Sequence, residues 1–409
     1  MNKKSLVIIA ILYLFSFPVK AQTKASVYSM FGVGQLFDNG VGINKSLGGT
    51  GIAFQSGRSM NYLNPASYLG ILPNSFVIEL GAFGSYNKSE NARVRQTVFD
   101  GNVNYFSASL FITNEWALSA GVIPFSSVEY EISSSDQIEG ELSTYKKTFT
   151  GRGGLNKMYL GNSFKVYEGL SAGFNASYIF GPLTQKEAAL QSGSFSGYEL
   201  VNERTAAGFY LDYGLQYSMK NNEWLYTAGL TFGSDKKLHT TNDLVLTYGE
   251  NTDTLEQQQS EITIPRRIGL GLSAKQGNNF RIGVDYEWGN WSQINYSNPN
   301  LNTRNSNRFS LGLEYSPTQN RSDEDWFKTF SYRAGANYKQ SYLQIDNTKI
   351  NSFGINIGVG IPSEKISMVN FSLEYGKEGT LSKGLIQNSY WMLYVNVSLQ
   401  SLWIMTPIE

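Results

Sequence analysis

Side chains of alternating polarity recur along most of this chain, in segments about ten residues long that polar turns separate. The segment VNFSLEY (369–375) shows the pattern, with an apolar residue at every second position and polar residues between. Because successive side chains of a β-strand point to opposite faces, each segment predicts a strand with one apolar face and one polar or glycine-rich face. The same alternation occurs at 170–178, 209–217, 282–288, 309–315, 332–338 and 353–361. We therefore predict an all-β protein.

The apolar faces are predicted to meet lipid rather than a second sheet. A soluble β-sandwich would alternate in the same way, but here apolar faces end in aromatic residues such as Tyr217 and Tyr315, as the girdles of membrane barrels do. Segments of this length also suit a tilted crossing of an outer membrane. The opposite face carries glycine and charge, and we predict that its charged residues, including Arg281, Asp285 and Arg333, line an internal lumen.

The spacing of turns predicts a transmembrane antiparallel β-barrel over residues 73–409. We expect about fourteen strands, an even number as in bacterial single-chain barrels. Short connections such as TNEW (113–116) alternate with long polar segments, as periplasmic turns alternate with extracellular loops. Because unpaired amides in hydrocarbon cost several kcal/mol each, we predict that the last strand (388–400) pairs with the first (75–87). The segments predicted as long loops are 134–156, 182–203, 249–260 and 292–305.

The first 21 residues have the features of a secretory signal peptide. Lys3 and Lys4 precede an apolar core, and a small-residue cleavage site ends at Ala21. The mature chain is predicted to begin at Gln22 and to reside in the outer membrane of a Gram-negative cell. No later apolar run reaches the roughly 20 residues that a spanning helix needs.

Composition argues against several function classes. The 33 basic and 33 acidic side chains balance, so no net charge draws the chain to nucleic acid. The chain has no cysteine, which excludes thiolate catalysis and cysteine-ligated metal. The single histidine, His239, lies in a polar stretch and is predicted to be a solvated residue at a loop or strand end. We predict no enzyme activity, no cofactor and no metal site.

One stretch mimics a nucleotide-binding motif. GLGLSA (269–274) resembles part of a dinucleotide fingerprint, but it lies inside an alternating segment with no helix after it. We interpret Gly269 and Gly271 as inward-facing strand residues.

Residues 22–72 precede the first predicted strand and do not alternate. A domain of that size is hard to stabilise alone, so we predict that the segment folds inside the barrel as a hatch, where inward polar side chains satisfy its backbone. The glycine-rich stretch SLGGTGIAF allows a tight path, and Asn64-Pro65 sets a rigid turn start. The candidate hatch glycines are Gly48, Gly49 and Gly51.

The tripeptide Asn64-Pro65-Ala66 resembles the NPA motif in the N-terminal hatch of the FadL/TodX long-chain fatty-acid transporters. The surrounding sequence is similar to the Bacteroidetes-type branch of that family, over essentially the whole mature chain. The resemblance implies an outer-membrane barrel, plugged by a hatch, that carries hydrophobic molecules inward. The motifs that carry it are, in order, SLGGTGIAF (46–54), LNPASY (63–68), GVIPFSSVEY (121–130), GRGGLNKMYLG (151–161) and LSAGFNASYIFG (170–181).

Pro124 interrupts the predicted third strand, where a proline removes a ladder hydrogen bond. In the family that the chain resembles, a kink in this strand opens the wall sideways, which makes Gly121 and Pro124 the candidate kink residues. The alternative is that Pro124 lies just above the membrane, where a bend has no consequence.

Two functions are consistent with these features. The resemblance implies passive uptake of hydrophobic molecules such as long-chain fatty acids, with release into outer-membrane lipid when the hatch shifts. Alternatively, the chain is a non-transporting barrel subunit of an outer-membrane machine, as a type 9 secretion shuttle or a barrel-assembly accessory, with outer-membrane or periplasmic protein partners. Inward charges such as Arg281, Asp285 and Arg333 would then belong to a closed polar network.

Overall fold

The strands close into one antiparallel barrel of 14 strands, as the alternation predicted. The computed structural model describes residues 26–37, 40–91, 95–137, 144–189, 197–294, 301–317, 326–363 and 367–402, and the predicted signal peptide lies outside them. The first barrel strand, β2 (Ser75–Glu90), pairs along its whole length with the last, β21 (Gln387–Leu402), so the predicted closure is confirmed. In these ranges, no helix combines the length and apolar character that crossing a membrane requires.

Several crossings of the wall are built from more than one strand. The first crossings are β2, β3 (Arg95–Thr113), the interrupted set β4 (Trp116–Pro124), β5 (Ser126–Ser127) and β6 (Tyr130–Gln137), and β7 (Thr144–Gly153) with β8 (Asn156–Tyr167). Next come β9 (Leu170–Ala189), β10 (Tyr198–Asn221), β11 (Trp224–Gly233) with β12 (Lys236–Tyr248), and β13 (Asn251–Ile264) with β14 (Arg267–Gln276). The last are β15 (Phe280–Gly289), β16 (Leu301–Thr303) with β17 (Ser306–Tyr315), β18 (Ser331–Ile345), β19 (Thr348–Pro362), β20 (Met368–Gly379) and β21.

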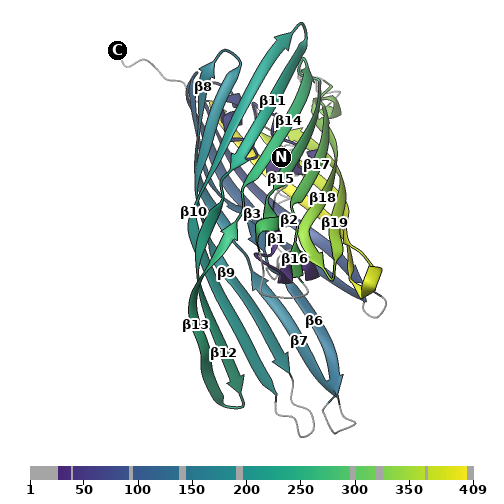
Figure 1. Cartoon of the computed structure of the whole chain (residues 1–409). Helices are drawn as coiled ribbons and strands as arrows, with labels where there is room; N and C mark the ends of the chain where they lie inside the picture. The colour runs from purple at the N-terminus through teal and green to yellow at the C-terminus, as the bar shows by residue number, and fades with distance from the viewer. Residues whose placement is uncertain are drawn as a thin grey trace, which may run out of the picture.

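One side of the wall continues far beyond the rest of the barrel. β6, β7, β12 and β13, with the adjoining ends of β9 and β10, reach well past the remaining strands at the end opposite the C-terminus (Figure 1). There β10 pairs with β9 and β12, and β12 pairs with β13. We name the part of the sheet formed by 130–137, 144–153, 183–189, 198–207 and 236–264 the extension.

The prediction of long loops at 134–156, 182–203 and 249–260 was therefore wrong, because most of these residues belong to β-strands. Their side chains no longer follow the pattern of a lipid-facing strand, yet their backbones stay paired. The fourth predicted loop, 292–305, includes β16 and overlaps the short helix η4 (Trp291–Gln293), and its residues 295–300 lie outside the described ranges.

The described N-terminal residues, 26–37 and 40–72, pack against the inward faces of the wall strands, and we call them the N-terminal segment. They form the short 3-10 helices η1 (Val27–Met30), η2 (Gly42–Leu47) and η3 (Pro65–Gly70), with the two-residue strand β1 (Gln35–Leu36). η3 packs against β8, β9 and β10, whereas η2 packs against β17 to β20 on another part of the wall. The segment therefore spans the lumen. Whether it moves as a hatch stays a prediction.

Candidate functional site

Asn64 begins η3 and also ties it to the barrel wall. Its side-chain oxygen accepts the backbone N–H of Ala66 at 3.0 Å, and Pro65 occupies the first helical position, where a missing N–H costs nothing. The Asn64 amide nitrogen donates to the carbonyl of Ile52 at 2.8 Å and to that of Leu215 in β10 at 3.1 Å. Asparagine fits this position because one side chain both caps the helix and bonds the wall.

The predicted glycines form a turn that a wall carboxylate holds. Gly48 and Gly49 adopt left-handed backbone conformations, with φ of 66° and 83°, which glycine tolerates best. Gly48 also lies directly against the backbone of Ala336 in β18, where a Cβ atom would clash. One oxygen of Asp285, in β15, accepts the backbone N–H groups of Gly51 at 2.7 Å and Ile52 at 2.9 Å.

The other predicted lumen charges also face inward, but they do not form one site with Asp285. Arg281 lies over the ring of Phe54, 5.1 Å from its centroid. Arg333 donates to Glu314 at 2.7 Å and to Asn370 at 2.9 Å, both on the wall. Each charge therefore stabilises a different contact of the interior.

Glu79 holds the segment from a different strand, β2, and sequence reasoning missed it. Its carboxylate accepts the hydroxyl of Ser59 at 2.7 Å, the N–H of Met60 at 2.9 Å and the hydroxyl of Tyr105 at 3.0 Å. An acidic residue at an inward position of the first strand was the available signal. Its partners could not be inferred, because β-strand periodicity does not say what lies across the lumen.

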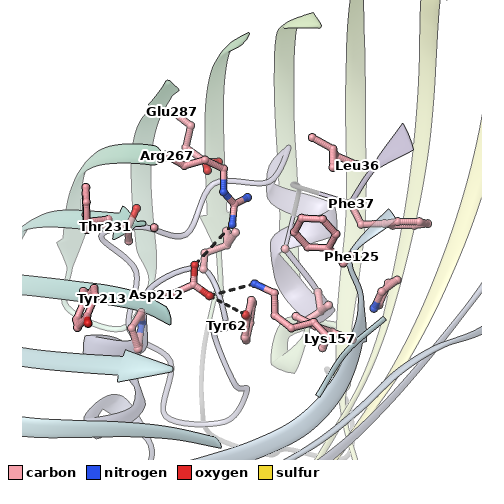
Figure 2. Close-up of a pocket in the computed structure, with 18 residues that line it drawn as sticks. Leu36, Phe37, Tyr62, Phe125, Lys157, Asp212, Tyr213, Thr231, Arg267 and Glu287 are labelled. Carbon is pink, nitrogen blue, oxygen red and sulfur yellow. Dashed lines mark hydrogen bonds and ion pairs between the residues drawn. The ribbon is translucent and has the colours of Figure 1, made fainter. Parts of the chain in front are cut away.

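A small cavity lies between the segment and the wall. Its volume is about 70 Å³, below the ~150 Å³ of an engineered protein cavity that holds benzene. Leu36, Phe37 and Phe125 form an apolar side, and Lys157 runs beside Phe125 with its ammonium directed toward Asp212 (Figure 2). This cavity is too small for an acyl chain.

Asp212, in β10, is the centre of the charged side of this cavity. Its carboxylate binds the Lys157 ammonium at 3.0 Å and the Arg267 guanidinium at 3.6 Å, and it accepts the Tyr62 hydroxyl at 3.2 Å (Figure 2). Burial, then the charge of Asp212, raises the pKa of Tyr62 well above its usual value, so this hydroxyl remains a donor. Glu287, also on the cavity, pairs with Arg308.

The wall is interrupted where the cavity touches it. β4 ends at Pro124. Its pairing with β3 ends two residues earlier, at Val122 opposite Phe106. The chain then turns to pair with the N-terminal segment, since β5 joins β1 through Leu36↔Ser126 and Gln35↔Ser127. Gly121 is not at this interruption, because it sits in a regular ladder with Ser107 on one side and Tyr159 on the other.

On the side of Pro124 toward the extension, two strand edges face the interruption without pairing to each other. Residues 95–105 of β3 pair only with β2, and β6 pairs only with β7 among the described strands. We call this opening the wall break. It is flanked on the outer surface by Phe99 and Val103, both strongly exposed.

Two sequence features acquire plain structural roles. His239 lies within β12, not at a loop or strand end, and its exposed side chain shares a surface with Lys237 and Glu261. Gly269 and Gly271 are buried residues of β14 that face Ile52 of the segment, as predicted. The nucleotide-like motif is therefore a surface against which the segment packs.

A closed barrel with an apolar outer surface and a filled, polar interior defines an outer-membrane β-barrel protein. The sequence matches the BamG family over residues 1–406, so the chain belongs to that family. No curated protein matches the sequence.

Solved structures with the same fold include a hydrocarbon channel, a toluene transporter and a FadL homologue, all at low sequence identity. The CymD monoaromatic hydrocarbon channel is 17% identical, with a TM-score of 0.58 over 90% of this chain and 99% of that one. The toluene transporter TodX of P. putida is 15% identical, with a TM-score of 0.59 over 90% of this chain and 100% of that one. A FadL homologue of Pseudomonas aeruginosa is 11% identical, with a TM-score of 0.52 over 94% and 99%. At these identities the likeness shows the fold.

Proposed function

We propose that this protein is an outer-membrane channel for hydrophobic molecules, described here in a closed state. The observation that carries the proposal is the wall break, because the apolar side of the cavity, formed by Leu36 and Phe125, reaches the wall beside it. A solute that leaves through this opening enters lipid without crossing water. The fold shared with structures titled as hydrocarbon and toluene channels supports the same function.

Opening requires the N-terminal segment to move as a hatch. The cavity of about 70 Å³ is too small for a long-chain fatty acid, and even for benzene by the ~150 Å³ comparison. The pairing of β1 with β5 joins the segment to the interrupted strand. Displacing β1 would therefore enlarge the cavity and free the edge of the wall break in one movement, which is the mechanism we propose for lateral release.

A reversible engineered disulfide, called the lock below, tests this mechanism. Because the chain has no native cysteine, no other disulfide can form. Gln35 and Ser127 are register partners, and directly opposed strand residues are close enough for a disulfide. In the variant Gln35→Cys/Ser127→Cys, oxidation should reduce uptake of labelled toluene and of labelled fatty acid by cells on the order of 10-fold, and a reductant should restore it. The two labels separate small aromatic from long-chain substrates.

The matched control is a second engineered disulfide that does not involve the N-terminal segment. Lys237 and Thr263 are register partners in the extension, so Lys237→Cys/Thr263→Cys should form a disulfide without changing uptake. Equal uptake by the oxidised and reduced Gln35→Cys/Ser127→Cys protein, with the disulfide verified, would contradict the channel proposal.

A second candidate function is a non-transporting barrel subunit of an outer-membrane machine, such as a secretion shuttle or a barrel-assembly accessory. The observation that favours it is the number of separate wall strands that hold the segment, with Glu79 on β2, Asp285 on β15 and Asn64 bonded to β10. Such a plug has no need to move. Co-purification with large partners in near-equal amounts, together with uptake that the lock leaves unchanged, is the outcome expected for this function.

A further inference from the structure

Asp100 is a buried carboxylate at the edge of the wall break, and the backbone N–H of Gly101 lies near it without meeting hydrogen-bond geometry. It lies on β3 and is 8% exposed. Neither of its side-chain oxygens meets a hydrogen-bond donor at bonding geometry among the described residues. Burying an ionised carboxylate without a partner costs several kcal/mol, so such a group either binds a cation or gives up its charge.

Further oxygen atoms lie next to Asp100 on the inner face of the wall. Its register partner on β2 is Ser85, and directly opposed side chains on one face have Cβ atoms ~4.5–5.5 Å apart. Asn87, two residues along the same face, is 1% exposed and donates its amide to the Ser85 hydroxyl at 2.8 Å. The side-chain oxygen of Asn87 has no donor in the described residues. Two unpartnered acceptor groups therefore lie along one short stretch of the β2–β3 pair.

A second carboxylate approaches from the other side of the wall break. Glu129, just before β6, is close enough to Asp100 for the two charges to interact. Its backbone is fixed by the N-terminal segment, because its carbonyl accepts the N–H of Ser26 at 3.0 Å and its N–H donates to the Ser29 hydroxyl at 3.0 Å. Asp100 and Glu129 thus lie on the two sides of the wall break, within electrostatic range of each other.

This set of groups matches a hard cation. Carboxylate and amide oxygens with waters are the ligands that Ca²⁺ takes, at six to eight positions and with flexible geometry. Asn102, two residues from Asp100 along β3, is exposed, so water reaches β3 close to the site. We propose that Asp100, Asn87 and Glu129 bind a divalent cation, with Ca²⁺ the best match, across the wall break.

The bound ion would join three parts of the molecule. Asp100 belongs to β3, Glu129 to the interrupted crossing, and Ser26 and Ser29 connect that crossing to the N-terminal segment. Cation binding would therefore hold the two sides of the wall break together and keep the start of the segment in place. This site does not depend on whether the barrel transports a solute or serves as a structural subunit.

Calcium titration of the purified mature protein tests the site. Protein in detergent, freed of metal with EDTA, should bind Ca²⁺ with a Kd of about 10⁻⁴–10⁻³ M, the range of extracellular calcium modules. Asp100→Asn keeps the side-chain shape and should weaken binding on the order of 10-fold or more, because it removes a ligand charge. Glu129→Gln should weaken binding in the same direction. Isothermal titration calorimetry measures all three proteins.

The matched control is Asp253→Asn, which removes an exposed carboxylate of β13 and should bind Ca²⁺ as the wild type does. Thermal unfolding gives a second readout, since Ca²⁺ should raise the Tm of the wild type and leave that of Asp100→Asn unchanged. The metal-free Asp100→Asn protein should be at least as stable as the metal-free wild type, because no charge is left buried. Absence of saturable binding to the wild type, or equal binding by Asp100→Asn, would overturn the proposal.

Discussion

The two ends of β10 present opposite surfaces, although the strand is continuous. In the membrane part, Phe209 and Leu215 point outward and are exposed at 70% and 43%, whereas Gln216 is buried against the N-terminal segment. In the extension, Glu203 is exposed on the outward face, and Ala206 on the inward face is fully buried in an apolar cluster.

In the extension, the neighbouring strand β12 has the same arrangement as that end of β10. Leu238, on the inner face of β12, is fully buried in that apolar cluster. The outer face of β12 carries Lys237, which pairs with Glu261 at 2.6 Å. Hydrogen-bonded backbone is common to both regions, so the surrounding medium decides which face is apolar. Where the outer face turns polar, the wall has left the hydrocarbon.

The largest effect is expected from Leu238→Ala, at the base of the extension. Leu238 is fully buried, so truncation should lower the free energy of unfolding by about 2–5 kcal/mol through lost burial and a cavity. Guanidinium titration in lipid vesicles measures the change. Leu255→Ala, at an exposed position of β13, is the control and should change stability by no more than about 0.5 kcal/mol. Equal effects at the two positions would show that the extension has no apolar inner side.

A charge placed on the outer face should distinguish the two regions directly. Leu215→Arg puts a cation against hydrocarbon and should cost about 2–4 kcal/mol, measured by the same titration. Thr241→Arg, on the exposed outer face of β12, should be within about 0.5 kcal/mol of the wild type. If Thr241→Arg were as costly as Leu215→Arg, the extension would lie in lipid and the comparison would fail.

The smallest effect is expected from the ion pair of Lys237 and Glu261. Both side chains are well exposed, at 65% and 44%, so Lys237→Ala should cost less than about 1 kcal/mol, and the loss should shrink in high salt. A double-mutant cycle with Glu261→Ala isolates the pair. A coupling that stayed above 1 kcal/mol at high salt would mean that this face is screened from solvent by another surface.

The reversal of polarity between the membrane part and the extension explains why the sequence predicted the barrel better than the extension. Alternation with the apolar side outward is easily recognised where lipid surrounds the strand, and the closure of β2 with β21 followed from the cost of an open edge. Residues 182–203 were predicted as a loop because charged residues such as Lys186 and Glu199 interrupt that pattern. They form a salt bridge on a paired strand instead.

The interior could be predicted only in part. The roles of Asn64 and Gly48 follow from local rules for helix caps and left-handed backbone, which need no knowledge of the wall. The partners of Glu79 and Lys157 depend on which strands lie across the lumen, and that information is absent from strand periodicity. Pro124 indicated a weak point in the ladder, but the pairing of β5 with β1 needed the three-dimensional path.

The inward glycines of the wall have a consequence for how such barrels can diverge. Gly173 lies against Pro65, Gly229 against Ile52, and Gly335 against Leu47, each with no space for a methyl group. The wall and the segment therefore have matching shapes, and neither can gain a side chain at these points alone. An N-terminal segment exchanged for that of a distant relative should fit only if the facing glycine positions are exchanged with it.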